Sequence, residues 1–197
     1  MNGAAHMNLI ARARQILLNP KQEWAAIDAE PTSIASLVVG YIAPLAAVGP
    51  VASLIGWSAF GVSLPLSGTL RVPLSAAARS ALVQYGLALA AVFVLAIVIE
   101  ALAPAFGGQK NRLQALKVAA YSSTAAWLAG VFGLLPALGL LGLVGLYSLY
   151  LLYLGLPVLM RTPRDKAVAY TVVVVIAGVV LFAAAGAITS RLAWRLS

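Results

Sequence analysis

The sequence predicts an all-α membrane protein, a polytopic bundle of five transmembrane helices with a short amphipathic N-terminal segment on the cytoplasmic face. Composition gives the first reason, because 62% of the 197 residues are hydrophobic and only 9% are charged. A soluble domain of ordinary composition has roughly a quarter of its residues charged. The second reason is the spacing of the charges, which leaves uncharged stretches as long as a bilayer crossing requires.

The chain before the first long apolar stretch divides into two parts. Residues 1–6 are interpreted as a cloning remnant, which contains His6, the only histidine. Residues 7–32 are expected to form a cytoplasmic interfacial helical segment, with a helix start at residues 19–22, where Asn precedes Pro. Trp24 either dips into the lipid headgroups or packs on the cytoplasmic loops, and the sequence leaves both interpretations open.

The uncharged stretches predict a membrane domain over residues 33–190. Its five spans are expected at about 33–60, 80–104, 116–134, 140–159 and 167–190. A kink is expected near Pro44 to Pro50 in the first span. The stretch from Val118 to Met160 would measure about 65 Å as one straight helix, so it must be a hairpin, with its turn at residues 135–139. Residues 191–197 are expected to form a short exterior tail.

The distribution of basic residues predicts the orientation of these spans. Five spans place the two termini on opposite sides of the membrane. Nine basic residues, here called the basic rim, fall on the N-terminal side: Arg12, Arg14, Lys21, Lys110, Arg112, Lys117, Arg161, Arg164 and Lys166. The other side has four: Arg71, Arg79, Arg191 and Arg195. The positive-inside bias therefore predicts a cytoplasmic N-terminus and a periplasmic or exterior C-terminus in a bacterial inner membrane.

Three stretches of the sequence carry a resemblance to a known family. They are RARQILLNPKQEWAAI, AYSSTAAWLAGVFGLLPALG and LYSLYLLYLGLPVLMRTPRDKAVAYTVVVVIAG. Over about Leu9 to Gly186 the chain resembles the bacterial branch of the Yip family, membrane proteins related to eukaryotic proteins that interact with Ypt/Rab GTPases. The resemblance implies five spans and a cytoplasmic N-terminus, and for the eukaryotic members a scaffold role in vesicle traffic. For the bacterial branch it implies no particular activity.

Glu100 is the one acidic residue within a predicted span, in the stretch VFVLAIVIEALAP. An intramembrane carboxylate usually faces a bundle interior and finds a partner. Residues at a similar expected depth, which would form an intramembrane polar layer with it, are Tyr41, Tyr121, Ser122 and Tyr153. Lys117 or Arg161 could also reach the carboxylate by snorkelling. Three interpretations stay open: a structural hydrogen-bond network, a transport or ion-coupling site, and a Glu at headgroup depth.

The residue inventory predicts no enzyme. No cysteine, paired intramembrane acid, metal-ligand spacing or glycine-rich phosphate loop is present, and no metal or cofactor is expected. We therefore expect a non-catalytic membrane-organising, scaffold or adaptor protein that acts through lipid and protein contacts. The expected partners are anionic lipid headgroups at the basic rim, together with a protein partner or a second copy, and no nucleic acid. The alternative is a small-solute or ion transporter that uses Glu100.

Overall fold

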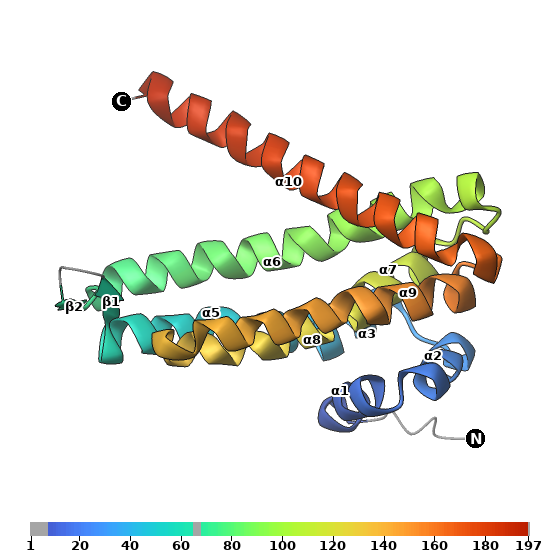
Figure 1. Cartoon of the computed structure of the whole chain (residues 1–197), viewed down its shortest axis with the longest axis horizontal. Helices are drawn as coiled ribbons and strands as arrows, with labels where there is room; N and C mark the ends of the chain where they lie inside the picture. Colours follow the sequence, from blue (N-terminus) through green and yellow to red (C-terminus); the bar gives the residue numbers. More distant parts are fainter. Residues whose placement is uncertain (1–7, 65–67, 197) are drawn as a thin grey trace.

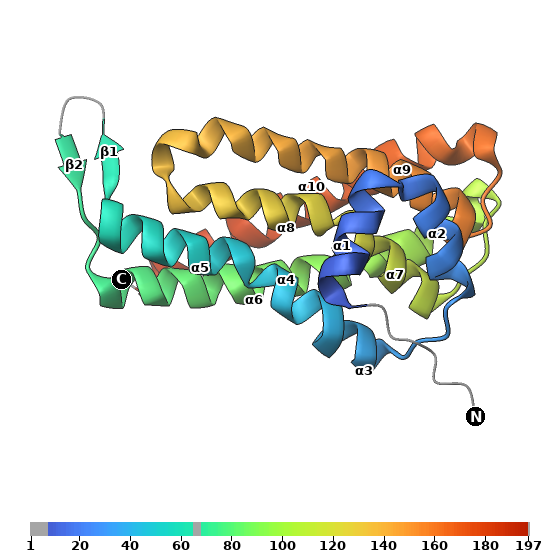
Figure 2. The same cartoon turned by 90° about the horizontal axis from the view of Figure 1, so that it is seen from below.

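The computed structural model describes residues 8–64 and 68–196. The interpretation of residues 1–6 as a remnant and the last residue of the expected tail therefore lie outside the described residues. The described chain is almost entirely helical, and its long helices run roughly along one direction (Figures 1 and 2). A small antiparallel hairpin, β1 (Val62–Leu64) and β2 (Gly68–Leu70), lies at one end. The prediction of an all-α fold is confirmed apart from this hairpin.

Two short helices precede the first long apolar stretch. Helix α1 spans Leu9–Leu18, and the Asn8 side chain accepts a hydrogen bond from its first turn. Helix α2 spans Pro20–Ala29 with Pro at its first position, so the predicted helix start at residues 19–22 is confirmed. The two helices lie across the bundle rather than along it (Figure 2).

The first long apolar stretch is helical from Ile34 to Phe60, but its hydrogen bonding is irregular. In order it contains α3 (Ile34–Leu37), the π-helix η1 (Val38–Ile42), α4 (Ala43–Ala46), α5 (Val48–Ile55) and the π-helix η2 (Gly56–Phe60). Pro44 and Pro50 lack the backbone N–H that a regular helix needs, so the breaks cluster around them. The kink predicted near Pro44 to Pro50 falls in this irregular stretch, where Ala47 forms a turn between α4 and α5.

The second long helix, α6, spans Leu74–Leu102 and continues into the 3-10 helix η3 (Ala103–Phe106). It begins six residues before the predicted start at residue 80. The prediction used Arg79 as a boundary, but Arg79 is exposed on the helix and Pro73 precedes the first turn. A long cationic side chain can lie near a helix end and extend its charge to water, so Arg79 does not terminate the helix.

A helical hairpin follows, as the length of the uncharged stretch predicts. Its first arm contains α7 (Arg112–Ser122), α8 (Thr124–Ala129) and the 3-10 helix η4 (Gly130–Leu134). Leu135 is extended, and the second arm contains the 3-10 helix η5 (Pro136–Leu146) and α9 (Tyr147–Leu159). The first arm breaks at Ser123, where the hydroxyls of Ser122 and Ser123 both donate to the Ala119 carbonyl. Such side-chain bonding to the preceding turn bends helices.

The last helix, α10, follows the short 3-10 helix η6 (Arg164–Lys166) and spans Ala167–Leu196. It thus continues through residues 191–196, where the sequence predicts a tail. Tyr170 and Val174 are fully buried in its first half, and the Tyr170 hydroxyl donates to the Ile99 carbonyl of α6. Towards its C-terminal end α10 diverges from α6 (Figure 1).

Within residues 8–64 and 68–196, three helical stretches are long and apolar enough to cross a membrane. They are Ile34–Phe60, Leu74–Phe106 and Leu140–Leu159. Large apolar side chains point outwards from them, with Val39 73% exposed and Leu82 71% exposed. Exposure of such side chains is favourable in lipid and costly in water. The third and fifth predicted spans, 116–134 and 167–190, stay predictions.

Candidate functional site

Several connections between helices lie at the end of the molecule opposite β1 and β2. We call this end the basic end. It comprises α1, α2, the connection from residue 107 to 111 and the connection from residue 160 to 166 (Figure 1). The two connections are bonded to each other, because the Gln109 N–H donates to the Met160 carbonyl at 2.8 Å. The end is therefore one surface built from segments far apart in the sequence.

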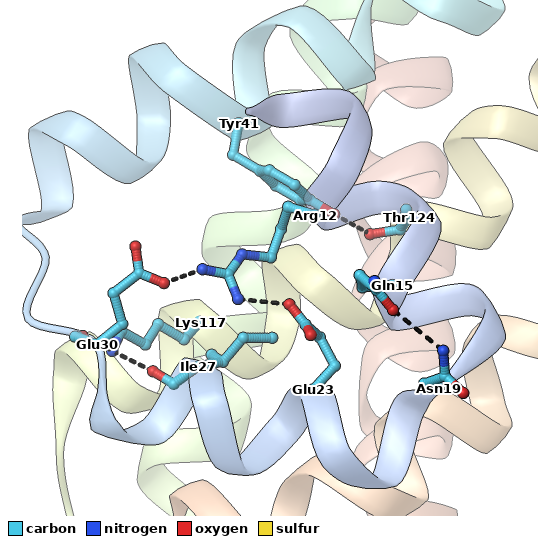
Figure 3. A network of polar contacts seen from close by, with 9 residues as sticks. All are labelled: Arg12, Gln15, Asn19, Glu23, Ile27, Glu30, Tyr41, Lys117 and Thr124. Atoms are coloured by element: carbon cyan, nitrogen blue, oxygen red, sulfur yellow. Dashed lines mark hydrogen bonds and ion pairs between the residues drawn. The ribbon is translucent and has the colours of Figure 1, made fainter. Parts of the chain in front are cut away.

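Arg12 is the centre of a largely buried cluster at this end (Figure 3). We call it the Arg12 cluster, and its other members are Glu23, Glu30, Tyr41, Lys117, Tyr121, Thr124 and Tyr147. The Arg12 guanidinium Nη1 donates to Glu23 Oε1 at 2.5 Å, and Nη2 pairs with Glu30 Oε2. The guanidinium carbon also lies 5.9 Å from the centre of the Tyr121 ring, within cation–π range. The side chains of Arg12 and Glu23 are 7% and 10% exposed, so their ion pair is largely shielded from water, whereas the Glu30 side chain is 31% exposed.

Two side chains of the bundle cap the C-terminal ends of α1 and α2. Lys117 of α7 is buried, and its Nζ donates to the carbonyls of Ile27 and Glu30, each at 2.7 Å. The Tyr147 hydroxyl of α9 donates to the Leu17 carbonyl at 3.1 Å. The last carbonyls of a helix lack partners within it, and a cation there also interacts favourably with the helix dipole. These bonds fix both helices to the bundle.

Three hydroxyl-bearing residues continue the cluster into the bundle. The Tyr41 hydroxyl lies 2.7 Å from Thr124 Oγ1, and Thr124 donates its own proton to the Tyr121 carbonyl at 2.7 Å. Tyr41 is therefore the donor in the pair with Thr124, because a threonine hydroxyl has one proton. The rings of Tyr41 and Tyr121 pack with centroids 4.5 Å apart. The first apolar stretch is thus joined to α7 and α8.

Trp24 packs inside the protein and does not lie among lipid headgroups. It is fully buried, and its ring meets Tyr121 edge-on with centroids 6.3 Å apart. Gly155 of α9 permits this contact, since a methyl group added there would lie 2.7 Å from Trp24 Cζ2. Of the two interpretations of this segment, the structure supports packing on the bundle.

Asp28 forms a second, outer contact between α2 and the basic end. Its Oδ2 pairs with the Arg161 guanidinium at 2.8 Å, and its Oδ1 accepts from the Gln114 amide at 3.2 Å. The Arg161 side chain is 58% exposed, so this pair is screened by solvent and contributes little by itself.

The Arg12 cluster has the charge balance and hydrogen bonding of a structural contact between helices. Its two cations, Arg12 and Lys117, are matched by the carboxylates of Glu23 and Glu30, so the cluster is neutral overall. Across the described ranges no group of three metal-ligating side chains is arranged to hold an ion. The cluster can hold helices in place. Loss of one charged partner would leave the other one charged and unpaired in an apolar environment.

The structure does not bring all residues of the predicted polar layer together. Tyr41 and Tyr121 lie together, whereas Ser122 is buried and donates to its own helix. Tyr153 lines a separate pocket beside α2. Glu100 lines another pocket, of about 180 Å³, and Arg112 is among its other lining residues. In the described part of the chain, the ion pairs involve the carboxylates of α2 and of Glu30, not Glu100.

The basic rim also needs a correction. Arg12 and Lys117 are buried, with 6% and 3% of their surface exposed, and are not available to lipid. The amphipathic pattern of α1 places Arg12 on the inward face with Ile16, four residues later. Neither Lys117 nor Arg161 reaches Glu100 by snorkelling, because Lys117 is bound to α2 and Arg161 to Asp28. The other seven rim residues are exposed: Arg14, Lys21, Lys110, Arg112, Arg161, Arg164 and Lys166.

Sequence reasoning missed Glu23, Glu30 and Thr124 as site residues. A signal for the two glutamates was present, because three of the five acidic residues of the chain fall between residues 23 and 30. A concentration of acids in a segment followed by apolar spans predicts that some of them have partners in the protein. Thr124 had a weaker signal, three residues after Tyr121 on the same helical face.

A cavity of about 730 Å³ lies between α6, the α7–α8 arm, α9 and α10. Its walls are mostly apolar and include Val92, Trp127, Leu152 and Val175. The polar side chains in its lining are those of Ser122, Ser123 and Ser148, and each already makes a hydrogen bond within the protein. Glu100 does not line it, so this cavity is separate from the pocket beside Glu100.

Comparison with known proteins gives one family match. The family model described as the Yip1 domain matches residues 14–185. The match begins within α1, includes every residue of the Arg12 cluster except Arg12 itself, and ends within α10. No curated protein and no solved structure matches the chain.

Proposed function

The chain belongs to the Yip family, and from this membership we propose that it is a non-catalytic membrane-organising protein, a scaffold or adaptor. It acts through lipid and protein contacts at its basic end. The observation that carries the proposal is the Arg12 cluster, which fixes α1 and α2 on the bundle by buried ion pairs and caps. A rigid surface of this kind suits docking more than chemistry.

The proposed arrangement in the membrane has five spans, with the basic end in the cytoplasm of a bacterial cell. The N-terminus is cytoplasmic and the C-terminus is periplasmic or exterior. Its support is the concentration of exposed cations at the basic end, because basic residues favour the cytoplasmic side. Anionic headgroups of the inner leaflet are then the nearest partners, and a protein partner or a second copy would meet the same surface.

The alternative function is a small-solute or ion transporter with Glu100 as its coupling residue. A transporter needs a polar path between the carboxylate and both sides of the membrane. Glu100 lines a pocket of about 180 Å³ shared with Phe93, Ile97 and Arg112, while the cavity of about 730 Å³ is mostly apolar and does not include it. These observations favour the scaffold.

Flux through reconstituted protein tests the choice between the two functions. The wild-type protein and Glu100→Gln are compared in liposomes loaded with pH-sensitive and cation-sensitive dyes. The scaffold proposal expects both to leak no faster than empty liposomes, with Glu100→Gln altering at most stability or association. A flux that is present in the wild type and lost in a well-folded Glu100→Gln protein would establish transport instead.

A further inference from the structure

We propose that the pocket between α2, α9 and the start of α10 binds the phosphate group of an anionic phospholipid. The proposal rests on the lipid contact of the basic end proposed above and gives that contact a defined site. The pocket has a volume of about 290 Å³, and its lining includes Lys21, Trp24, Tyr153, Pro157, Arg164 and Ala167.

Two cations reach the pocket from different parts of the chain. Lys21 is the second residue of α2, and Arg164 begins the 3-10 turn that leads into α10. Both are exposed, and neither forms an ion pair or a side-chain hydrogen bond in the described part of the structure. Two such cations provide the charge that a phosphate with one net negative charge requires.

The backbone strengthens this preference for an anion. Helix α2 begins at Pro20, so the N-terminal end of a 10-residue helix adjoins the pocket. Helix α10 continues directly from η6, and the Ala167 N–H at its start already donates to the Arg164 carbonyl. A helix N-terminus has a partial positive charge and free N–H groups, and it favours phosphate. Carboxylates of α2 do not compete, because Glu23 is bound by Arg12 and Asp28 by Arg161.

One residue that lines the pocket also has an unpartnered donor. Trp24 lines the pocket, is fully buried, and its indole Nε1 has no hydrogen-bond partner among the described residues. A buried N–H without an acceptor is costly, and native structures usually satisfy it. An acceptor in the pocket reaches this nitrogen only if the surrounding side chains shift, because Nε1 exposes less than 1 Å² of surface.

The apolar half of the lining distinguishes a phospholipid from free phosphate. Leu154, Pro157 and Val158 of α9 form one wall, and they belong to a predicted span that enters the membrane from this end. A lipid can place its phosphate between Lys21 and Arg164 and its glycerol and upper acyl carbons against that wall. Inorganic phosphate would leave the wall unfilled.

Ligand titration of the full chain in a neutral detergent tests the proposal. The probes are short-chain phosphatidylglycerol, short-chain phosphatidylcholine and inorganic phosphate, and binding is measured from the rise in unfolding temperature. Phosphatidylglycerol should raise it most. The double variant Lys21→Gln/Arg164→Gln should bind phosphatidylglycerol about tenfold more weakly or worse, since two charge-assisted contacts are lost.

Two further double variants locate the site. Arg71→Gln/Arg79→Gln removes the same charge far from the basic end and should bind like the wild type, whereas Arg14→Gln/Lys110→Gln removes rim charge outside the pocket and should lose less than the pocket variant. The unfolding temperatures without lipid check that all the variants fold. The charge-preserving variant Lys21→Arg/Arg164→Lys should retain most of the affinity.

Three outcomes would overturn the proposal, and they separate it from the proposed function. Equal losses in the pocket variant and in Arg14→Gln/Lys110→Gln would mean diffuse attraction, so the basic end would contact lipid without this site. Binding of inorganic phosphate alone, dependent on Lys21 and Arg164, would make the pocket a free-phosphate site. No preference for phosphatidylglycerol in any protein would remove both the pocket and the lipid contact of the basic end.

Discussion

Arg12 is the residue on which the attachment of α1 depends most. Its guanidinium compensates two carboxylates, and Glu23 has a side chain only 10% exposed. Arg12→Met leaves Glu23 buried without a partner and should lower the free energy of unfolding by about 3–5 kcal/mol. The exposed neighbour Arg14 provides the control, because Arg14→Met should change it by about 0.5 kcal/mol or less. Thermal unfolding in detergent measures both.

A second substitution separates lost charge from lost packing at the same position. The double variant Arg12→Met/Glu23→Gln also removes the Glu23 charge, which Arg12→Met alone leaves buried without a partner. It should recover a substantial part of the lost stability, because neutralising both members of a buried pair is often nearly neutral. A double variant as unstable as the sum of its single variants would contradict the role assigned to this ion pair.

The hydroxyl pair Tyr41–Thr124 should behave as a coupled unit. Tyr41→Phe removes the donor to Thr124 Oγ1 and Thr124→Val removes the acceptor. Each variant should cost about 0.5–1.5 kcal/mol, and the double variant should cost less than their sum. Unfolding midpoints of the four proteins give the coupling energy, and strict additivity would show that the hydrogen bond contributes nothing.

At the scale of elements, the close approach of α2 to α9 depends on Gly155. Gly155→Ala places a methyl group against the Trp24 ring and should loosen α2, since forced overpacking costs about 1–3 kcal/mol. Trypsin should then cleave after Lys21 about fivefold faster or more. Gly86→Ala on α6, where an added methyl meets nothing within 4 Å, should leave the cleavage rate unchanged. Equal rates in the two variants would contradict the packing of α2 on α9.

Most helices could be predicted from the sequence, because apolar stretches between charges define them. The hairpin turn followed from the length of one stretch, and the start of α2 from Asn19 and Pro20. Helix α6 begins at Leu74, before the span predicted from residue 80, because an exposed cation can belong to a helix end. Charge counting alone did not predict the Arg12 cluster, since it shows neither the inward face of α1 nor the long-range partner of Lys117.

At the scale of the whole molecule, the absence of cysteine from the sequence makes the predicted topology directly measurable. Single cysteines at the exposed positions Gln109 and Asp165 should resist a membrane-impermeant thiol reagent in intact cells and react after the membrane is opened. Cysteines at the exposed positions Ser75 and Leu135 should react in intact cells. The opposite pattern would reverse the orientation, and a mixed pattern within either pair would exclude five spans arranged as predicted.

The basic end is one rigid surface, because ion pairs join α1 to α2 and helix caps join these two helices to α7 and α9. Its rigidity explains how exposed cations on separate segments could present a defined surface to lipid or to a partner. Without that attachment, Lys21 would move independently of Arg164, and the phosphate pocket would not exist as a site.

Hydrogen–deuterium exchange of the protein in lipid nanodiscs tests the attachment of the N-terminal helices most directly. We predict that backbone amides of residues 9–29 exchange as slowly as those of α9 in the wild type. In Arg12→Met they should lose this protection while α9 retains it. Exchange of residues 9–29 at the rate of an unstructured peptide in the wild type would contradict the account, because α1 and α2 would then not be part of the folded bundle.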